Sequence, residues 1–553
     1  VAVEAVPLGA DPERAAAVDR YDRASATFVH YRHDPRRPDT LSSDRVTALL
    51  EDRDGVIWVG TVAGLNALPP GRDGFRRYTN DPRDPTSLGN DVVTSLAQDS
   101  GGLLWVGTYA GLSYWDVRTA PMAHYRAAPG GNTLNEAAVT DLFEDADGKV
   151  WVSTFGGGLN VLDPESNTFS HVRASDGLSS DRVSVVAADA GGAIWAGTRS
   201  RGINRIDPVD GSIRVVRKGA DGAGGLREDG VSALLLDSSR RFWVGTFGGG
   251  LHYLDEASGQ IVPWQPPGTE ALAADRIVAL YEDSLGYLWV GTYGKGLRRI
   301  DLDDATVMTV SPRENDAAGL TGENILTIAE DRFGHLWISA QGRGLNRWRL
   351  DARRASIPTF DHFDVSDGLP HSTVYGAVTD SNGLLWFSTG TGLARVDPRS
   401  FEVVTYDTND GLQDLEFNTG AAIAASDGRL YFGGINGFNA FRPEQIRRNS
   451  HVPRVSITGF SRLNEPVAYR PYLLDRQPIE LTHRDYFIEF EMASLDFAAP
   501  RDNRYRYRLE GLDTAWVESG TRRTATYTNL GAGDYVFRVQ GSNDDGVWSE
   551  EEA

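Results

Sequence analysis

The side chains best suited to hold a ligand recur at one point of a repeated motif, just after a Gly-Thr pair or its equivalent. Most of them are aromatic or cationic. Aromatic faces stack on the C–H surfaces of sugars, and arginine forks grip carboxylates or sulfates. The motif therefore predicts a binding face for a polar ligand. The predicted ligand-binding residues are Tyr109, Phe155, Arg199, Arg201, Phe247, Tyr293, Lys295, Gln341 and Arg343.

Acidic residues recur at a second point of the motif, shortly before its first apolar run. In a four-stranded unit this segment and the loop just described lie at the same end, so acids should alternate there with aromatics and cations. The alternative interpretation is that hairpin loops tolerate many residue types and that these side chains merely face solvent. The acids are Asp44, Asp91, Asp181, Asp229 and Asp275.

Sequence motifs for thiol chemistry or metal binding are absent. The chain has no cysteine, which excludes disulfides, thiolate ligands and cysteine nucleophiles. The ten histidines are scattered, with no two at ligand spacing on one predicted element. Asp52-Arg-Asp-Gly55 has the start of a calcium loop but lacks its later ligands, and a hairpin turn accounts for it. We expect neither a metal nor a cofactor.

The sequence Trp-Val-Gly-Thr and its variants recur along most of the chain. In the clearest copy, Leu41 is followed by an apolar run at residues 46–50, a turn, and Trp58-Val-Gly-Thr61. Nine copies at intervals of 44 to 49 residues indicate a repeat architecture. The aromatic landmarks are Trp58, Trp105, Trp151, Trp195, Trp243, Trp289, Trp337, Trp386 and, less regularly, Tyr431.

Each copy predicts four short antiparallel strands, which is the pattern of a propeller blade. The tryptophan stands between apolar residues at the same point of each blade, so we interpret it as packing between blades and not as a sugar platform. Helical periodicity is absent from almost the whole chain. We therefore expect an all-β protein whose main domain is a single large β-propeller over residues 25–445.

The ends of the repeat array indicate how the ring closes. Phe28-Val-His-Tyr31 matches the fourth strand Phe75-Arg-Arg-Tyr78, whereas the ninth copy supplies three strands and then stops. We therefore predict about nine four-stranded blades, latched by the N-terminal strand after a lead-in of residues 1–24. Propellers usually have four to eight blades, so seven or eight blades, or a fragment of a longer array, are the alternatives. Val18-Asp-Arg-Tyr-Asp22 resembles the end of a further third strand, which favours the fragment.

The repeat stops near Asn449, and a second domain is predicted over residues 450–553. Its alternating strands and the turn Gly531-Ala-Gly-Asp534 are typical of a small β-sandwich of the immunoglobulin or fibronectin type. Tyrosines alternate along these strands, for example at Tyr505 and Tyr507. We expect them to pack within the sandwich and not to form a recognition surface.

The chain is acidic, with a formal net charge of −22. Nucleic acids and anionic membranes attract cationic surfaces, so neither is an expected partner. The longest apolar runs fall far short of the ~18 residues that span a bilayer. We expect a folded disc whose only link to a membrane is a helix outside this sequence.

Two stretches carry a family resemblance. Glu282-Asp-Ser-Leu-Gly-Tyr-Leu-Trp-Val-Gly-Thr-Tyr-Gly-Lys-Gly-Leu297 resembles the two-component regulator propeller repeat. Asn503-Arg-Tyr-Arg-Tyr-Arg-Leu-Glu-Gly-Leu512 looks like the triple-tyrosine domain that follows such propellers. The match extends from about Tyr21 to Ser549. The chain departs from well-known members in its repeat number, since those carry two seven-bladed rings, and in the absence of an output domain.

The resemblance implies the periplasmic sensor region of a membrane receptor, in which a transmembrane helix and a histidine kinase or diguanylate cyclase follow. It also implies a small polar ligand such as an oligosaccharide, a homodimer, and no catalysis by this region. The alternatives are a propeller enzyme acting on glycans, of the sialidase or lyase type, and a passive protein-interaction scaffold. No local motif commits the chain to such an enzyme, although residues distant in sequence can converge in space.

Overall fold

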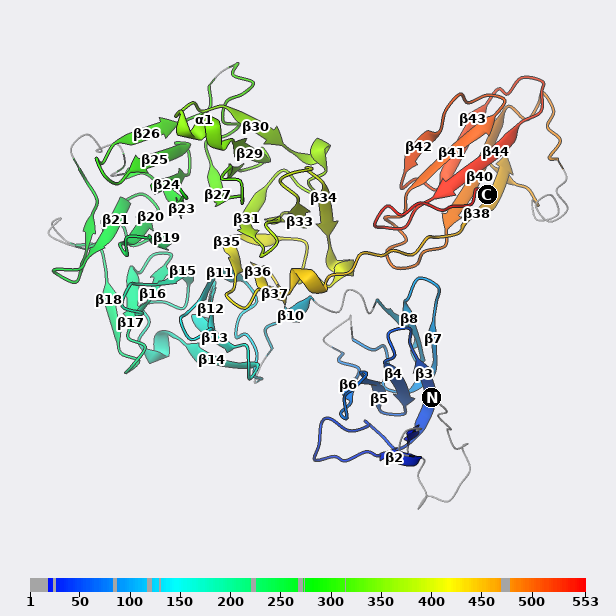
Figure 1. Ribbon diagram of the computed structural model, residues 1–553, viewed down its shortest axis with the longest axis horizontal. Coiled ribbons are helices and arrows are strands. Elements are labelled where there is room, and N and C mark those ends of the chain that lie inside the picture. The colour runs from blue at the N-terminus through cyan, green and yellow to red at the C-terminus, as the bar shows by residue number, and fades with distance from the viewer. Residues whose placement is uncertain are drawn as a thin grey trace. The chain divides into compact units, whose positions relative to one another are not determined.

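The computed structural model describes residues 18–22, 26–82, 87–116, 122–128, 131–219, 225–266, 272, 274–313, 315–468 and 478–553. Most of its regular structure is antiparallel β-sheet (Figure 1). The chain divides into two compact units, the larger Ala120–Ile446 and the smaller Val1–Thr119 with Arg447–Ala553. Among the described residues, no helix is long and apolar enough to cross a membrane.

The larger unit is a β-propeller of seven four-stranded sheets, counted over the described residues (Figure 1). Blade 1 comprises β11 (Val139–Glu144), β12 (Val150–Thr154), β13 (Leu159–Asp163) and β14 (Thr168–Val172). Blade 2 comprises β15 (Val183–Ala188), β16 (Ile194–Thr198), β17 (Ile203–Ile206) and β18 (Ile213–Val216). Blade 3 comprises β19 (Val231–Leu236), β20 (Phe242–Thr246), β21 (Gly250–Asp255) and β22 (Gln260–Pro263).

The next three blades repeat this order. Blade 4 comprises β23 (Ile277–Glu282), β24 (Tyr287–Thr292), β25 (Leu297–Asp301) and β26 (Val307–Val310). Blade 5 comprises β27 (Ile325–Glu330), β28 (Leu336–Ala340), β29 (Leu345–Trp348) and β30 (Phe360–Phe363), with the short helix α1 (Leu350–Arg354) before its last strand. Blade 6 comprises β31 (Val374–Thr379), β32 (Leu385–Thr389), β33 (Gly392–Val396) and β34 (Val403–Tyr406).

Blade 7 closes the ring with strands from both ends of the unit. β10 (Ala123–Tyr125) pairs antiparallel with β37 (Gly437–Phe441), which follows β35 (Phe417–Ala424) and β36 (Leu430–Gly434). Across this pair Tyr125 stacks on Phe438, with ring centroids 4.6 Å apart and an interplanar angle of 11°. The prediction of nine blades over residues 25–445, latched by the N-terminal strand, is therefore wrong, and the seven-bladed alternative describes the ring.

The predicted latch belongs to a different hairpin. β2 (Thr27–Tyr31) pairs with β1 (Val18–Asp22), and this pairing agrees with the expectation of a third strand there. Residues 1–17 and 23–24 of the predicted lead-in, and residue 25 at the start of the predicted propeller, lie outside the described residues. A fourth-strand sequence is suited to the outer edge of any blade, so the repeat pattern alone does not determine which copy closes the ring.

The first complete repeat and the first three strands of the second form separate sheets in the smaller unit. One sheet contains β3 (Val46–Glu51), β4 (Ile57–Thr61), β5 (Gly64–Leu68) and β6 (Arg76–Tyr78). The other contains β7 (Val93–Gln98), β8 (Leu104–Thr108) and β9 (Gly111–Trp115). Neither sheet shares a strand with the seven-bladed ring.

Residues after 447 form the predicted sandwich from two sheets. One sheet has the order β39 (Glu465–Pro466), β38 (Val455–Arg462), β40 (Phe487–Ser494) and β43 (Thr524–Thr528). The other has the order β42 (Val517–Gly520), β41 (Tyr505–Glu510) and β44 (Val536–Gly541). Tyr505 is buried, and its hydroxyl accepts the backbone N–H of Ser494 at 3.1 Å, so this tyrosine packs in the core as expected.

A bond between tryptophan and aspartate, buried in most copies, fixes the first hairpin of each regular blade. The indole Nε1–H of Trp243 donates to Oδ2 of Asp237 at 2.8 Å, while Oδ1 accepts the backbone N–H of Arg241 at 2.7 Å. The indoles also pack between blades, as the sequence predicts, whereas this bond was not predicted. Equivalent bonds of 2.7 to 2.9 Å join Trp58 to Asp52, Trp105 to Asp99, Trp151 to Asp145, Trp195 to Asp189, Trp289 to Asp283, Trp337 to Asp331 and Trp386 to Asp380.

Side chains on the innermost strands also bond from blade to blade. Ser232 Oγ–H donates to the carbonyl of Ile277 in the next blade at 2.6 Å, from a β-bulge in β19. On β11, Oδ2 of Asp141 accepts the backbone N–H of Val186 in blade 2 at 2.9 Å. These bonds connect neighbouring blades close to the axis of the ring.

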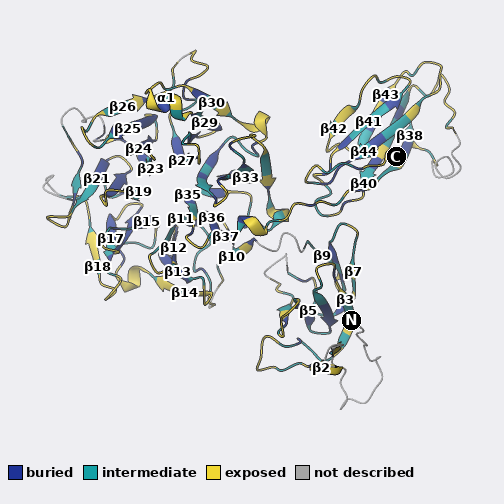
Figure 2. Ribbon diagram, in the orientation of Figure 1, coloured by how far each residue is buried: buried dark blue, intermediate teal, exposed yellow. Residues whose placement is uncertain are grey.

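Burial decreases toward the outer strand of a blade (Figure 2). In blade 2 every residue of the second strand β16 is buried, whereas the fourth strand β18 is intermediate or exposed. The core thus consists mainly of second and third strands packed against their neighbours. The loops at the ends of these strands are held on a rigid scaffold, which is where binding residues are usually placed.

Candidate ligand-binding face

The loop between the second and third strands of a blade lies against the segment that precedes its first strand. The backbone N–H of Phe155 donates to the carbonyl of Ala138 at 2.9 Å, and that of Tyr293 to the carbonyl of Arg276 at 2.8 Å. The two segments therefore share one end of the blade, as predicted. We call the loops 155–158, 199–202, 247–249, 293–296, 341–344, 390–391 and 435–436, with the residues directly before each first strand, the loop face.

The structure brings most of the predicted ligand-binding residues to this one end of the ring. Tyr109 is the exception, because it follows β8 in the smaller unit, where its ring is 78% exposed. The exposure of the others suits a binding role, which stays a prediction. The residues of the loop face from this set, all exposed, are Phe155, Arg199, Arg201, Phe247, Tyr293, Lys295, Gln341 and Arg343.

Two arginines of blade 2 lie over the exposed aromatic ring of blade 1. The guanidinium carbons of Arg182 and Arg199 are 5.4 Å and 5.8 Å from the centroid of the Phe155 ring, which is 43% exposed. Cation–π contact orients both guanidinium groups at the surface. The arrangement leaves less of the ring free for a sugar than the sequence alone implies, and places two cations beside it.

A similar contact joins blades 3 and 4. Arg276 lies over Phe247 at 5.3 Å, and Tyr293 approaches the same ring with centroids 6.1 Å apart and an angle of 52°. Arg276 and Arg182 were not among the predicted residues. A usable signal was present, because each directly follows an aspartate and directly precedes the first apolar residue of a blade.

Gly230 allows the loops of blades 2 and 3 to approach closely. A Cβ atom at this position would lie 2.9 Å from the backbone oxygen of Arg199, which is closer than real Cβ contacts. Gly230 in turn accepts the backbone N–H of Phe247 at 2.8 Å through its carbonyl. The glycine therefore places the Arg199 loop beside the Phe247 loop.

The predicted acids serve the backbone of the loop face. Oδ1 of Asp181 accepts the N–H of Ala174 at 2.7 Å, and Oδ1 of Asp229 accepts the N–H of Lys218 at 2.7 Å. Asp275 is buried and pairs with Arg298 at 3.2 Å. These acids lie in the loop face, as the sequence predicts, and the three carboxylates hold the loops through backbone bonds or an ion pair.

Most cations of the loop face, in contrast, are not held by ion pairs. Within the part of the chain that the structure describes, Arg182, Arg199, Arg201, Arg276 and Lys295 form no ion pair with a carboxylate. Guanidinium and ammonium groups without a protein partner are suited to bind a carboxylate or sulfate from solution. These cations lie on a face that also carries acids such as Glu136, Glu228 and Glu323, in a chain whose net charge is −22.

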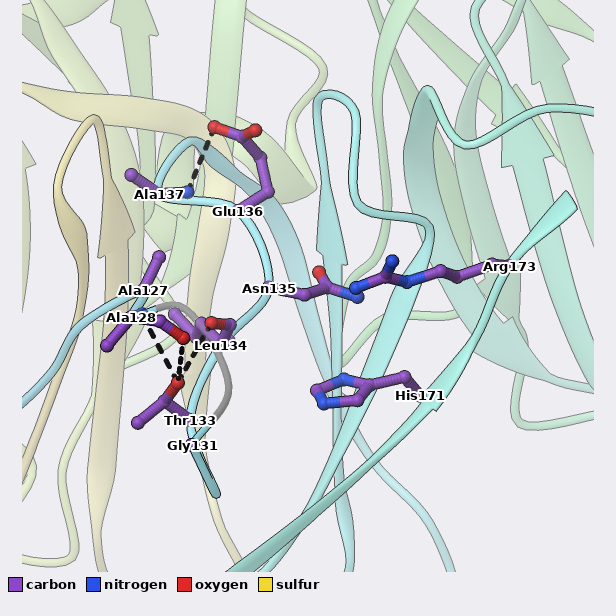
Figure 3. Close-up of a pocket in the computed structure, with 10 residues that line it drawn as sticks. All are labelled: Ala127, Ala128, Gly131, Thr133, Leu134, Asn135, Glu136, Ala137, His171 and Arg173. Carbon is purple, nitrogen blue, oxygen red and sulfur yellow. Dashed lines mark hydrogen bonds between the residues drawn. The ribbon is translucent and has the colours of Figure 1, made fainter. Parts of the chain in front are cut away.

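A pocket of about 650 Å³ adjoins this face at the seam between blades 7 and 1 (Figure 3). One wall comes from the chain between β10 and β11, and the other from the end of β14. The Nδ2 group of Asn135 donates to the carbonyl of Gly157 in the blade 1 loop at 2.8 Å. The pocket could not be predicted from the sequence, because its walls meet only once β10 has closed the ring. Its lining residues are Ala127, Ala128, Gly131, Thr133, Leu134, Asn135, Glu136, Ala137, His171 and Arg173.

Two family models match the chain. The two-component regulator propeller model matches residues 40–63, 87–110, 133–156, 271–294 and 319–342. The Y_Y_Y domain model matches residues 496–553, within the sandwich. The chain therefore carries two-component regulator propeller repeats and a C-terminal Y_Y_Y domain.

A curated relative and two solved structures share parts of this arrangement. Histidine kinase P4 of Formosa agariphila is 32% identical over 202 residues, which is 35% of this chain and only 15% of that protein. The extracellular domain of BT3049 from B. thetaiotaomicron, described as a hybrid two-component system, has a TM-score of 0.75 and 22% identity, covering 97% of this chain and 69% of that one. That of BT4673, from the same organism, has a TM-score of 0.49 and 20% identity, covering 97% and 70%. The chain thus shares the fold of the BT3049 extracellular domain.

Proposed function

We propose that this chain is the periplasmic, ligand-binding region of a membrane-bound two-component receptor and that its loop face binds an anionic oligosaccharide. The architecture supports the receptor assignment. The observation that supports the ligand class is the set of unpaired cations beside exposed aromatic rings.

The chemistry of the loop face suits a carboxylated or sulfated sugar. Arg182 and Arg199 are oriented by Phe155, so little side-chain entropy is lost when their forks meet an anionic group. A hydrogen bond between charged groups contributes about 1.5–3 kcal/mol. The exposed edges of Phe155 and Phe247 add apolar surface for sugar C–H groups.

Binding without turnover is the proposed role. A ligand that binds one arrangement of a homodimer more tightly than another shifts the population toward it, and the Y_Y_Y sandwich would pass that shift to a membrane helix and kinase outside this sequence. Incubation with the oligosaccharide, followed by chromatography, should return it unchanged. A shortened or unsaturated product would favour the glycan-active enzyme instead.

Calorimetric titration of the chain with a sulfated or carboxylated oligosaccharide, and with a neutral one of equal length, tests the proposal. The anionic ligand should bind more tightly, with affinity falling as salt rises. Arg199→Gln should weaken binding about tenfold. Arg214→Gln is the matched control, since this exposed arginine lies on β18 at the outer edge of the same blade. Equal affinity for neutral and anionic ligands, or equal effects of the two substitutions, would refute the proposal.

A further inference from the structure

The pocket at the seam of blades 7 and 1 has a polar wall of unlike groups (Figure 3). Oδ1 of Asn135 is buried and has no hydrogen-bond partner, although the Nδ2 of the same amide is held by Gly157. A buried acceptor without a partner costs about 1–3 kcal/mol unless water or a ligand supplies a donor. This amide oxygen is covered by protein atoms and faces Gly157, so it supports the wall of the pocket and does not contact a ligand.

Glu136 follows Asn135 on the same wall, and His171 lies on the other wall, at the end of β14. Nδ1 of His171 lies 3.0 Å from Oδ1 of Asn160, and burial, followed by the charge of Arg173, lowers the pKa of His171. The imidazole is therefore neutral near pH 7, and its remaining ring nitrogen is available to a hydroxyl. Oε1 of Glu136 accepts the backbone N–H of Ala137 at 3.0 Å, which leaves its second oxygen as a further acceptor.

The wall that carries His171 also holds one cation, Arg173. The backbone N–H of Arg173 donates to Asp176 at 2.9 Å, whereas its guanidinium pairs with no carboxylate among the described residues. Figure 3 shows this guanidinium extending toward Asn135. The rest of the wall between β10 and β11 is mainly apolar or small, from Ala127, Ala128 and Leu134.

We infer that this pocket is a binding site for one acidic sugar unit, a hexuronate, with its carboxylate on Arg173 and its hydroxyls on His171 and Glu136. The volume of about 650 Å³ is in the range of small-molecule sites. A single guanidinium matches a single carboxylate, and the Glu136 carboxylate disfavours ligands with several negative charges. The alanine side chains offer the sugar ring an apolar contact.

Opposite effects of two substitutions test the assignment. Calorimetric titration with D-glucuronate and D-galacturonate should show binding by the unmodified chain, and D-glucose should bind at least tenfold more weakly. Arg173→Gln should weaken uronate binding about tenfold, since it removes a charge-assisted bond. Glu136→Gln should strengthen it, because the variant keeps the acceptor for Ala137 but loses the negative charge. A purely structural disturbance would weaken binding in both variants.

The neighbouring blade supplies the matched control. Arg217 follows β18 as Arg173 follows β14, and its exposed side chain does not line the pocket. Arg217→Gln should leave uronate affinity unchanged. No binding of either uronate by the unmodified chain, or equal losses in the Arg173 and Arg217 variants, would overturn the inference.

Two further measurements distinguish a free uronate from the end of a longer chain, and the pocket from the loop face. If an oligosaccharide with a terminal uronate competes with free glucuronate and binds more tightly, the pocket holds the end of a chain; if only the free acid binds, it holds a monosaccharide. The proposed loop face is tested by Arg199→Gln, which should not alter glucuronate affinity. Unchanged oligosaccharide affinity in Arg199→Gln refutes the loop-face proposal alone, and unchanged uronate affinity in Arg173→Gln refutes the pocket proposal alone.

Discussion

Trp243 and Asp237 form a buried hydrogen bond between the two strands of one hairpin, with the indole Nε1 2.8 Å from Oδ2. Both side chains are almost fully buried, so the carboxylate depends on its protein partners for solvation. The same bond recurs in the other regular blades, which makes it the common internal support of the hairpin turn.

We predict that Trp243→Phe lowers the free energy of unfolding beyond the loss of packing, because the Asp237 carboxylate loses its indole donor. The additional cost should be about 1–3 kcal/mol. Trp264→Phe is the control, since Trp264 is buried in the same blade and packs edge-on against Trp243 at 6.0 Å without this aspartate. Urea unfolding followed by circular dichroism measures both. Equal losses would show that the bond adds nothing to packing.

Ring closure gives a second prediction. Tyr125→Ala removes the stack on Phe438 and should destabilise the propeller by about 2–4 kcal/mol. Phe28→Ala changes the strand that the sequence wrongly assigns to closure, and its ring is 58% exposed. This variant should leave the thermal unfolding of the propeller unchanged. The opposite pattern, with the larger effect at Phe28, would restore the N-terminal latch.

Asp141 should make the ring less stable as the pH rises. Burial raises the pKa of this carboxyl to about 7, and its bonds to backbone N–H groups only partly oppose that rise. A carboxyl with a raised pKa holds its proton more tightly in the folded state, so its contribution is fully present below pH ~4 and is lost as the pH passes 7. Asp141→Asn keeps an acceptor for Val186 and should gain more stability at pH 8 than at pH 5. A gain that is equal at both values would contradict the prediction.

His252 should make the protein less stable as the pH falls. It stands where blade 2 has Asn204, and its Nε2 accepts the backbone N–H of Arg227 at 3.1 Å. Burial lowers the pKa of His252 to about 4, so stability is lost as the pH falls from about 6.5 toward 4. The loss between pH 7 and pH 5 should be on the order of 2 kcal/mol. His252→Asn should remove most of it, as measured by calorimetry at both pH values.

The repeat made the blades predictable but not their assembly. Trp58 and its equivalents lie at a fixed distance from a turn aspartate, so hairpin, packing and strand number follow from each copy. Ala123-His-Tyr125 and Phe28-Val-His-Tyr31 are both plausible fourth strands, and their pairing partners lie hundreds of residues away or in a neighbouring hairpin. The choice depends on the geometry of a closed ring, which no single repeat encodes.

The candidate sites were likewise predictable where they depend on a single repeat and not where they depend on how the blades assemble. The exposed positions Phe155 and Arg199 could be predicted, since both follow the second strand of a blade. Arg182 could not be paired with Phe155 in advance, because the contact joins two blades. The pocket around Asn135 could not be predicted either, because one of its walls follows the closing strand β10.

The closing pair also determines how the ring responds to mechanical load. The chain enters blade 7 at Ala123 and leaves it at Phe441, and Ala123 lies opposite Ala440 in the antiparallel pair. Tension between the two connections therefore acts at the same end of three paired positions and separates them one after another, like a zipper, instead of shearing them together. Both connections to the smaller unit pass through this blade. The pair of β10 and β37 is therefore where we expect the propeller to unfold first under tension.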